Sequence, residues 1–206
     1  EGSVMIGTLT TCIEGSGCQS PAKLSLMTVL SEGALTGYLS LPKGCAAPGL
    51  EQRVSLQLSA DSLMAAGNAF MKAGNFERAV GAFKRLSELP ERREDLEVLY
   101  QLGSAHNGNK QYAEGRKVLE RASVLPSFST ASAPIRSLIL YNLGCAEAVL
   151  SEKDAALVPR AIAHVGQALA IKGSEVSRED AAVDGDLSAL RSNPDFQKLL
   201  AKKGPR

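Results

Sequence analysis

Two stretches of this chain carry the same pattern of apolar and small residues. Residues 63–90 read LMAAGNAFMKAGNFERAVGAFKRLSELP, and residues 99–126 read LYQLGSAHNGNKQYAEGRKVLERASVLP. Gly67 and Gly103 are 36 residues apart, as are Pro90 and Pro126. A fixed period in this range is typical of stacked repeats, in which each unit is a helical hairpin that buries its apolar face against its neighbours. The chain is therefore predicted to be mainly α-helical.

Helical periodicity and punctuation place three hairpins along residues 59–173. Ser59 lies at a predicted N-terminal cap, Gly74 ends the first helix, and Pro159 suits a helix start. The predicted helices cover residues 62–73, 76–89, 95–107, 112–124, 135–150 and 160–171. Gly144 follows Gly103 by 41 residues, and the extra length is assigned to the loop-like composition of residues 127–134.

Residues 1–58 differ from the rest in composition. Short runs rich in Thr, Val and Leu alternate apolar and polar residues and are separated by turn signals, at residues 4–10, 23–30, 34–41 and 53–58. Such runs predict strands joined in a small antiparallel β segment. The chain begins with Glu1 instead of methionine, as expected of a fragment or a processed or tagged form.

The last segment, residues 174–206, is predicted to close the stack. A polar linker over residues 174–185 leads to a final helix, for which Asn193 is the expected cap and Phe196, Leu199 and Leu200 the apolar stripe. Terminal units of repeat proteins need a polar outer face, and this segment fits that role.

These positions together resemble the tetratricopeptide repeat family. The resemblance covers about residues 60–172 and rests on Gly67 and Phe70 in the first helix and on the spacing of Ala79, Phe83 and Pro90. The chain departs from the family pattern where an aromatic residue is usual, since His106 and Glu147 stand there, and where Gly115 replaces a small alanine. The resemblance implies a helical-hairpin superhelix preceded here by the small β segment.

In that family the first helix of each repeat lines a concave groove that binds a partner. The resemblance therefore implies a protein or peptide partner at groove positions from three repeats: Met64, Asn68, Met71, Tyr100, Gln101, Ser104, Asn107, Tyr141, Asn142 and Cys145. Amide, tyrosine and methionine side chains suit an extended peptide, because they combine hydrogen bonding with adaptable apolar area. Packing of Tyr100 and Tyr141 inside the protein is the alternative.

One subclass of the family is excluded. Tetratricopeptide domains that hold the acidic C-terminal tails of heat-shock chaperones share a clamp of two lysines, an arginine and two asparagines. Asn68 matches one asparagine, but Met64, Leu138 and Asn142 stand where the cations belong and Gln101 replaces the second asparagine. A bound carboxylate would then lack a charged partner.

No motif for catalysis or for a cofactor is found. The histidines, His106 and His164, lie on different repeats without a carboxylate or cysteine at ligand spacing, and no phosphate-binding glycine motif or nucleophile elbow occurs. The sequence therefore predicts neither an enzyme nor a metal or cofactor site.

The four cysteines do not decide whether the protein lies in an oxidising or a reducing compartment. Cys12 and Cys18 or Cys18 and Cys45 could pair in an oxidising, exported compartment, whereas reduced thiols would agree with an intracellular protein. Their spacing fits a zinc site poorly.

Charge and hydropathy argue against nucleic acid as a partner and against a membrane span. A net charge of +1 supplies no field for nucleic acid, and no apolar run is long enough to span a membrane. The sequence predicts an adaptor or scaffold that binds a partner protein through the groove. The alternative is a subunit of a multiprotein complex in which the β segment docks by strand addition and the repeats are a support.

Overall fold

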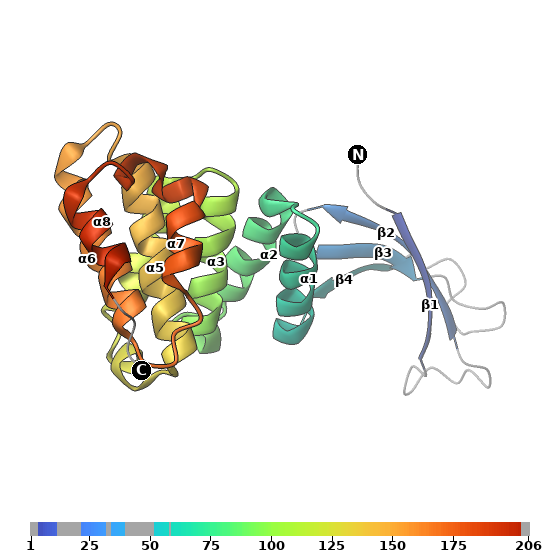
Figure 1. Cartoon of the computed structure of the whole chain (residues 1–206). Helices are drawn as coiled ribbons and strands as arrows, with labels where there is room; N and C mark the ends of the chain where they lie inside the picture. Colours follow the sequence, from blue (N-terminus) through green and yellow to red (C-terminus); the bar gives the residue numbers. More distant parts are fainter. Residues whose placement is uncertain (1–3, 12–21, 32–33, 40–51, 58, 203–206) are drawn as a thin grey trace. The chain divides into compact units, whose positions relative to one another are not determined.

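The computed structural model describes residues 4–11, 22–31, 34–39, 52–57 and 59–202, with side chains from residue 59 to residue 202. The chain divides into two compact units, residues 1–62 and residues 63–206. The described residues are mainly helical, as predicted, and Figure 1 gives the element labels. Cys12, Cys18 and Cys45 lie outside the described residues, so the predicted disulfide alternatives stay open.

In the first unit, the described strands form one antiparallel meander in the order β1-β2-β3-β4. Their bounds are β1 Val4–Thr11, β2 Ala22–Ser31, β3 Ala34–Leu39 and β4 Gln52–Gln57. Leu9 lies opposite Leu24, Leu30 opposite Leu35, and Leu35 opposite Leu56.

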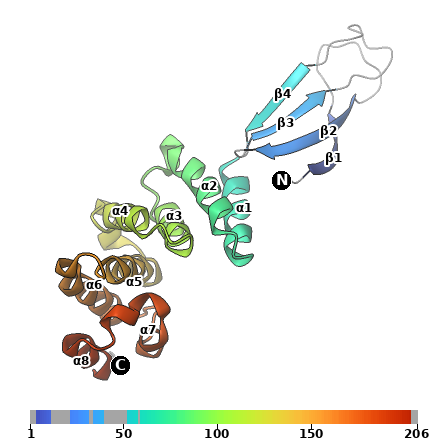
Figure 2. The ribbon, with the colours of Figure 1, turned by 90° about the horizontal axis from the view of Figure 1, so that it is seen from above.

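The second unit is built from consecutive helical hairpins. Its helices are α1 Ala60–Lys72, α2 Phe76–Glu88, α3 Leu96–Gly108, α4 Tyr112–Ser123, α5 Ala133–Leu150, α6 Val158–Ala170, α7 Arg178–Val183 and α8 Pro194–Ala201. The short 3₁₀ turns are η1 Pro90–Arg92, η2 Pro126–Thr130, η3 Ala155–Leu157 and η4 Gly185–Leu190. Figure 2 shows α1, α3, α5 and α7 on one side of this unit and α2, α4, α6 and α8 on the other.

Helix ends follow from local side chains. Ser59 Oγ accepts from the Ser62 N–H, Asp95 Oδ1 accepts from the Glu97 N–H, and Asn193 Oδ1 accepts from the Asp195 N–H. Each bond satisfies a backbone donor that has no partner within the first turn of its helix. Gly74, in the turn between α1 and α2, has a φ of 69°, a conformation that favours glycine.

Glycines in the first helices mark where the two helices of a hairpin touch. A Cβ atom on Gly67 would overlap the Phe83 ring, and one on Gly103 would overlap the Leu119 side chain. On Gly144 it would lie 2.7 Å from Val165 Cγ2 and 3.1 Å from the carbonyl oxygen of Ala161. The same contact therefore recurs in all three hairpins, an arrangement compatible with an α-solenoid.

The helical core continues from one hairpin to the next. One buried cluster joins α3, α4 and α5 through Leu99, Leu119, Ile139 and Leu143. A second joins α5 and α6 to the C-terminal segment, with Val165, Leu187, Leu190 and Phe196 completely buried or nearly so. Stacked units thus bury apolar faces that a single hairpin would expose.

The predicted linker at residues 174–185 differs from the structure. Residues 178–183 form α7, and its N-terminus carries a capping box in which Ser177 Oγ accepts from the Asp180 N–H and the Asp180 carboxylate accepts from the Ser177 N–H. These reciprocal bonds stabilise a helix start even in a polar segment. Residues 174–202 therefore pack as further helical layers on α5 and α6.

Candidate functional site

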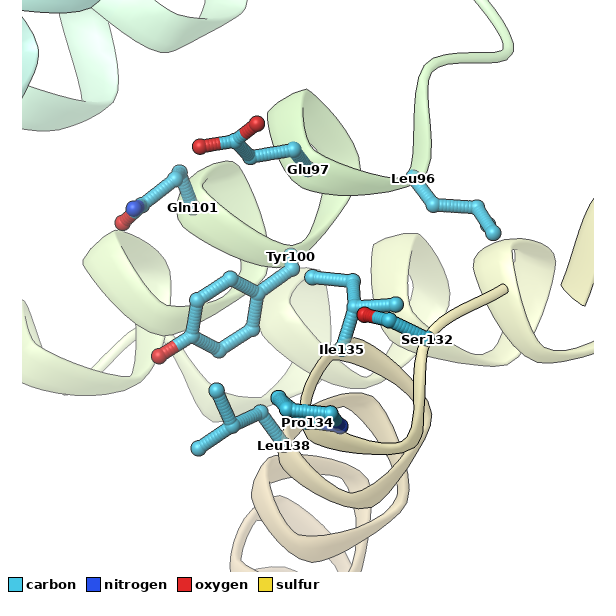
Figure 3. A pocket seen from close by; sticks show the side chains of 8 residues that line it. All are labelled: Leu96, Glu97, Tyr100, Gln101, Ser132, Pro134, Ile135 and Leu138. Carbon is cyan, nitrogen blue, oxygen red and sulfur yellow. The ribbon is translucent and has the colours of Figure 1, made fainter. Parts of the chain in front are cut away.

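A pocket of about 390 Å³ opens between the first turns of α3 and α5. Figure 3 shows the side chains that line it: Leu96, Glu97, Tyr100, Gln101, Ser132, Pro134, Ile135 and Leu138. Its volume lies within the range of pockets that hold small molecules or single side chains of a partner. Of the residues predicted to bind a partner, Tyr100 and Gln101 line this pocket.

Helical spacing explains how α3 contributes to the pocket. Leu96 and Tyr100 are four residues apart, as are Glu97 and Gln101, so they form two adjacent rows on α3. From α5, Ile135 and Leu138 complete the apolar part of the lining. The result is a pocket with an apolar floor and a polar edge.

Two details define the polarity of the pocket. The Tyr100 phenol is a neutral hydroxyl at physiological pH, as tyrosine ordinarily is, and burial raises its pKa further. The Glu97 side chain is exposed, and no described residue forms an ion pair with its carboxylate. The pocket thus pairs a neutral interior with one negative charge at its edge.

The predicted positions in α1 lie apart from this pocket. Asn68 is exposed, and Met64 and Met71 are half-buried. Ser104, one turn after Tyr100, is half-buried, and its Oγ atom is shielded from solvent. Asn68 is therefore accessible to solvent, and Met64 and Met71 are accessible in part. We call the surface formed by α1, α3 and α5 the first-helix face.

Four other predicted positions have roles inside the protein. The Asn107 side chain is 5% exposed, and its Nδ2 donates to the Asn142 carbonyl at 2.9 Å. Asn142 Nδ2 in turn donates to the Leu138 carbonyl, one turn back in α5. Asn107 therefore joins α3 to α5, and its amide is not available to a partner.

Tyr141 and Cys145 are covered by the C-terminal segment. The Tyr141 hydroxyl donates to Asp184 Oδ2 at 2.7 Å, and Cys145 Sγ lies 3.8 Å from the same oxygen. Tyr141 therefore packs inside the protein, which was the alternative prediction for it. Asn107, Tyr141 and Cys145 were predicted to lie on the binding surface, but the structure buries all three. The reason is that η4 and its cap fold back onto α5.

A second tyrosine also holds the C-terminal segment that covers these residues. The Tyr112 hydroxyl donates to Asp186 Oδ1 at 2.9 Å, and burial together with this bond raises the pKa of Tyr112 to about 12. Burial also raises the pKa of the Asp186 carboxyl. Two tyrosine–aspartate hydrogen bonds therefore fasten the C-terminal segment to α4 and α5.

A separate polar cluster surrounds Glu147, which stands where the repeat pattern has an aromatic residue. This side chain is completely buried, and His164 Nδ1 lies 2.6 Å from its Oε2 atom. Arg160 Nε is 3.1 Å and Arg116 Nε 3.6 Å from Oε1. The carboxylate thus connects α5 to both α4 and α6.

Glu120 completes this cluster at the surface. Its carboxylate accepts from Arg160 Nη2 at 2.7 Å, a bond that lowers the pKa of Glu120 and raises the pKa of Arg160. Sequence spacing did not reveal that His164 has a carboxylate partner, because Glu147 lies 17 residues away on another helix. The cluster neutralises a buried charge and is assigned a structural role.

Within the described part of the chain, no group of three or more metal-ligating side chains gathers in one place. Over the same residues, no helix is both long and apolar enough to cross a membrane. No protein-family model matches the chain, and no curated protein aligns with it significantly.

Proposed function

We propose that this chain is a protein-interaction module of the tetratricopeptide type, an adaptor or scaffold that binds a partner protein or peptide through the first-helix face. The observation that supports the proposal is the pocket between α3 and α5, whose lining includes Tyr100 and Gln101, two of the groove positions that the repeat resemblance implies. The proposal includes no catalytic role.

The accessible side chains of this face suit an extended polypeptide. Asn68 and Gln101 each offer donors and an acceptor, which match the alternating N–H and C=O groups of a peptide backbone. Met64 and Met71 supply adaptable apolar area on α1. The proposed binding set is therefore Met64, Asn68, Met71, Tyr100 and Gln101.

A charge placed at the centre of this face tests the proposal. Gln101→Arg is expected to weaken capture of partner proteins from an extract of the source organism by about tenfold, since a bulky cation replaces an amide at the pocket edge. Gln167→Arg is the matched control, because Gln167 is exposed on α6, on the opposite side of the hairpins. Captured proteins are quantified by mass spectrometry after both variants are shown to melt like the unmodified chain.

An equal yield from Gln101→Arg and the unmodified chain would contradict binding through this face.

The second candidate, a complex subunit that docks through its β segment, has one observation in its favour. In the described sheet, β1 and β4 are outer strands that each pair on one side only, and strand addition uses such an edge. A chain that lacks residues 1–58 and keeps its helical circular dichroism would lose its partners under this candidate and keep them under the first.

A further inference from the structure

The pocket between α3 and α5 also indicates what kind of peptide would occupy it. We infer that it takes one aliphatic side chain of an extended peptide whose next same-face residue is a lysine or arginine paired with Glu97. This inference rests on the proposed function and adds the chemistry of the ligand. It commits to a peptide partner, because the lining offers separate sites for a side chain and for a charge.

The apolar part of the pocket defines the anchor. Leu96, Pro134, Ile135 and Leu138 provide aliphatic walls, and the neutral Tyr100 ring lies beside them in Figure 3. The lining buries no unpaired charge against a side chain that enters this space, so an apolar residue is favoured there over a polar one. Centrally placed apolar anchors of this kind commonly carry most of the binding energy of an interface.

Glu97 defines the second position. Its carboxylate is exposed at the edge of the pocket and has no cationic partner among the described side chains, while Asp95 nearby is paired with Arg92. A cation of the ligand can therefore pair with Glu97 without breaking an existing ion pair. Asp95, two residues before Glu97, is already engaged by Arg92 and is therefore a weaker partner for a basic residue of the ligand.

The geometry of an extended peptide sets the spacing of the two positions. Its side chains alternate in direction, so residues two apart face the same surface about 6.8 Å from each other. Glu97 lies one helical turn before Tyr100 and Gln101, a comparable separation of about 5–6 Å between neighbouring Cβ atoms. The expected ligand therefore has an aliphatic residue and a basic residue separated by one intervening position.

An oriented library of immobilised ten-residue peptides tests this preference with the full chain. In each pool one pair of positions, two apart, is fixed and the others are mixed. The unmodified chain is expected to favour leucine, isoleucine or methionine at the anchor about tenfold over serine. It is expected to favour lysine or arginine at the second position about threefold over glutamine.

Two variants assign these preferences to the pocket. Glu97→Lys should abolish the basic preference and favour aspartate or glutamate while it leaves the aliphatic preference intact. Leu138→Ser should reduce the aliphatic preference and keep the basic one. Leu138 belongs to neither buried core cluster described above, so this variant is expected to fold.

Matched controls separate these effects from general changes of the surface. Glu77 is the second residue of α2 as Glu97 is of α3, and both are exposed, so Glu77→Lys should leave the selection unchanged. Val183 is an apolar side chain that is 76% exposed on α7, and Val183→Ser should also have no effect.

The inference is overturned if the chain retains no peptide above background, if the selected residues are not aliphatic and basic, or if Glu77→Lys changes the basic preference as much as Glu97→Lys does. The proposed function fails separately, when Gln101→Arg leaves capture of intact partner proteins unchanged. A chain that loses partners on Gln101→Arg but shows no aliphatic and basic selection keeps the function and rejects this ligand.

Discussion

Replacing His164 with leucine is expected to lower the free energy of unfolding by about 3 kcal/mol, because the buried Glu147 carboxylate then loses its closest partner. The two groups are 2.6 Å apart, and Glu147 is completely shielded from water. Arg160 and Arg116 remain at 3.1 Å and 3.6 Å from the other carboxylate oxygen and do not replace the lost contact. Urea unfolding at pH 7, followed by circular dichroism, measures the loss.

A second substitution shows whether the buried charge is the cause. Adding Glu147→Leu to His164→Leu should restore much of the stability, since an apolar pair needs no ion pair and both arginines remain partly exposed near Glu120. His106→Leu is the control, because the His106 ring is hydrogen-bonded to the exposed Gln111 side chain and not to a buried charge, and about 0.5 kcal/mol or less is expected. If the losses of unfolding free energy in the single variants His164→Leu and Glu147→Leu simply add in the double variant, the account of this cluster is wrong.

Gly144→Ala is the second substitution with a large expected effect. The added Cβ would lie 2.7 Å from Val165 Cγ2 and would also meet the backbone of α6 at Ala161 and Val165. A backbone cannot rotate away as a side chain can, so α5 and α6 must separate. We expect a loss of about 1–3 kcal/mol in the free energy of unfolding.

Gly81→Ala provides the opposite control for this substitution. Gly81 lies within α2, is exposed, and a Cβ atom there would meet nothing within 4 Å. Alanine favours a helix over glycine by up to about 1 kcal/mol, so this variant should be more stable than the unmodified chain. The melting temperatures of both variants and of the unmodified chain are compared at one protein concentration. A Gly144→Ala chain that melts at or above the melting temperature of the unmodified chain would contradict the α5–α6 contact.

The contacts within each hairpin were predictable because they are local and repeated. Gly67 and Phe83, and Gly103 and Leu119, recur at one spacing, and small residues opposite large ones are required wherever two helices cross closely. The caps at Ser59 and Asn193 were also readable, since a side-chain acceptor next to an apolar period identifies a helix start.

The burial of the groove positions in the third repeat could not be predicted from the same pattern. Tyr141 and Cys145 occupy groove positions by spacing, but they are buried because Asp184 and η4 return to α5 from about 40 residues away. The pairing of Glu147 with His164 likewise depends on how α5 and α6 face each other. Hydrophobic periodicity reports which side of a helix is buried and carries no information about which polar residues will meet there.

One missed element did have a local signal. Ser177 and Asp180 form a capping box three residues apart, which marks a helix start within the segment expected to be a linker. The pocket residues Leu96 and Glu97 had a signal too, because they precede Tyr100 and Gln101 by one helical turn.

Site-specific photo-crosslinking tests the central claim, binding through the first-helix face, most directly. A benzophenone amino acid is placed at Gln101, beside the α3–α5 pocket, or at Lys84, exposed on α2 on the other side of the hairpins, and the full chain is irradiated in an extract of the source organism. The account predicts a discrete crosslinked partner from position 101 and none from position 84. Crosslinks from position 84 alone, equal crosslinks from both positions, or none from either would contradict it.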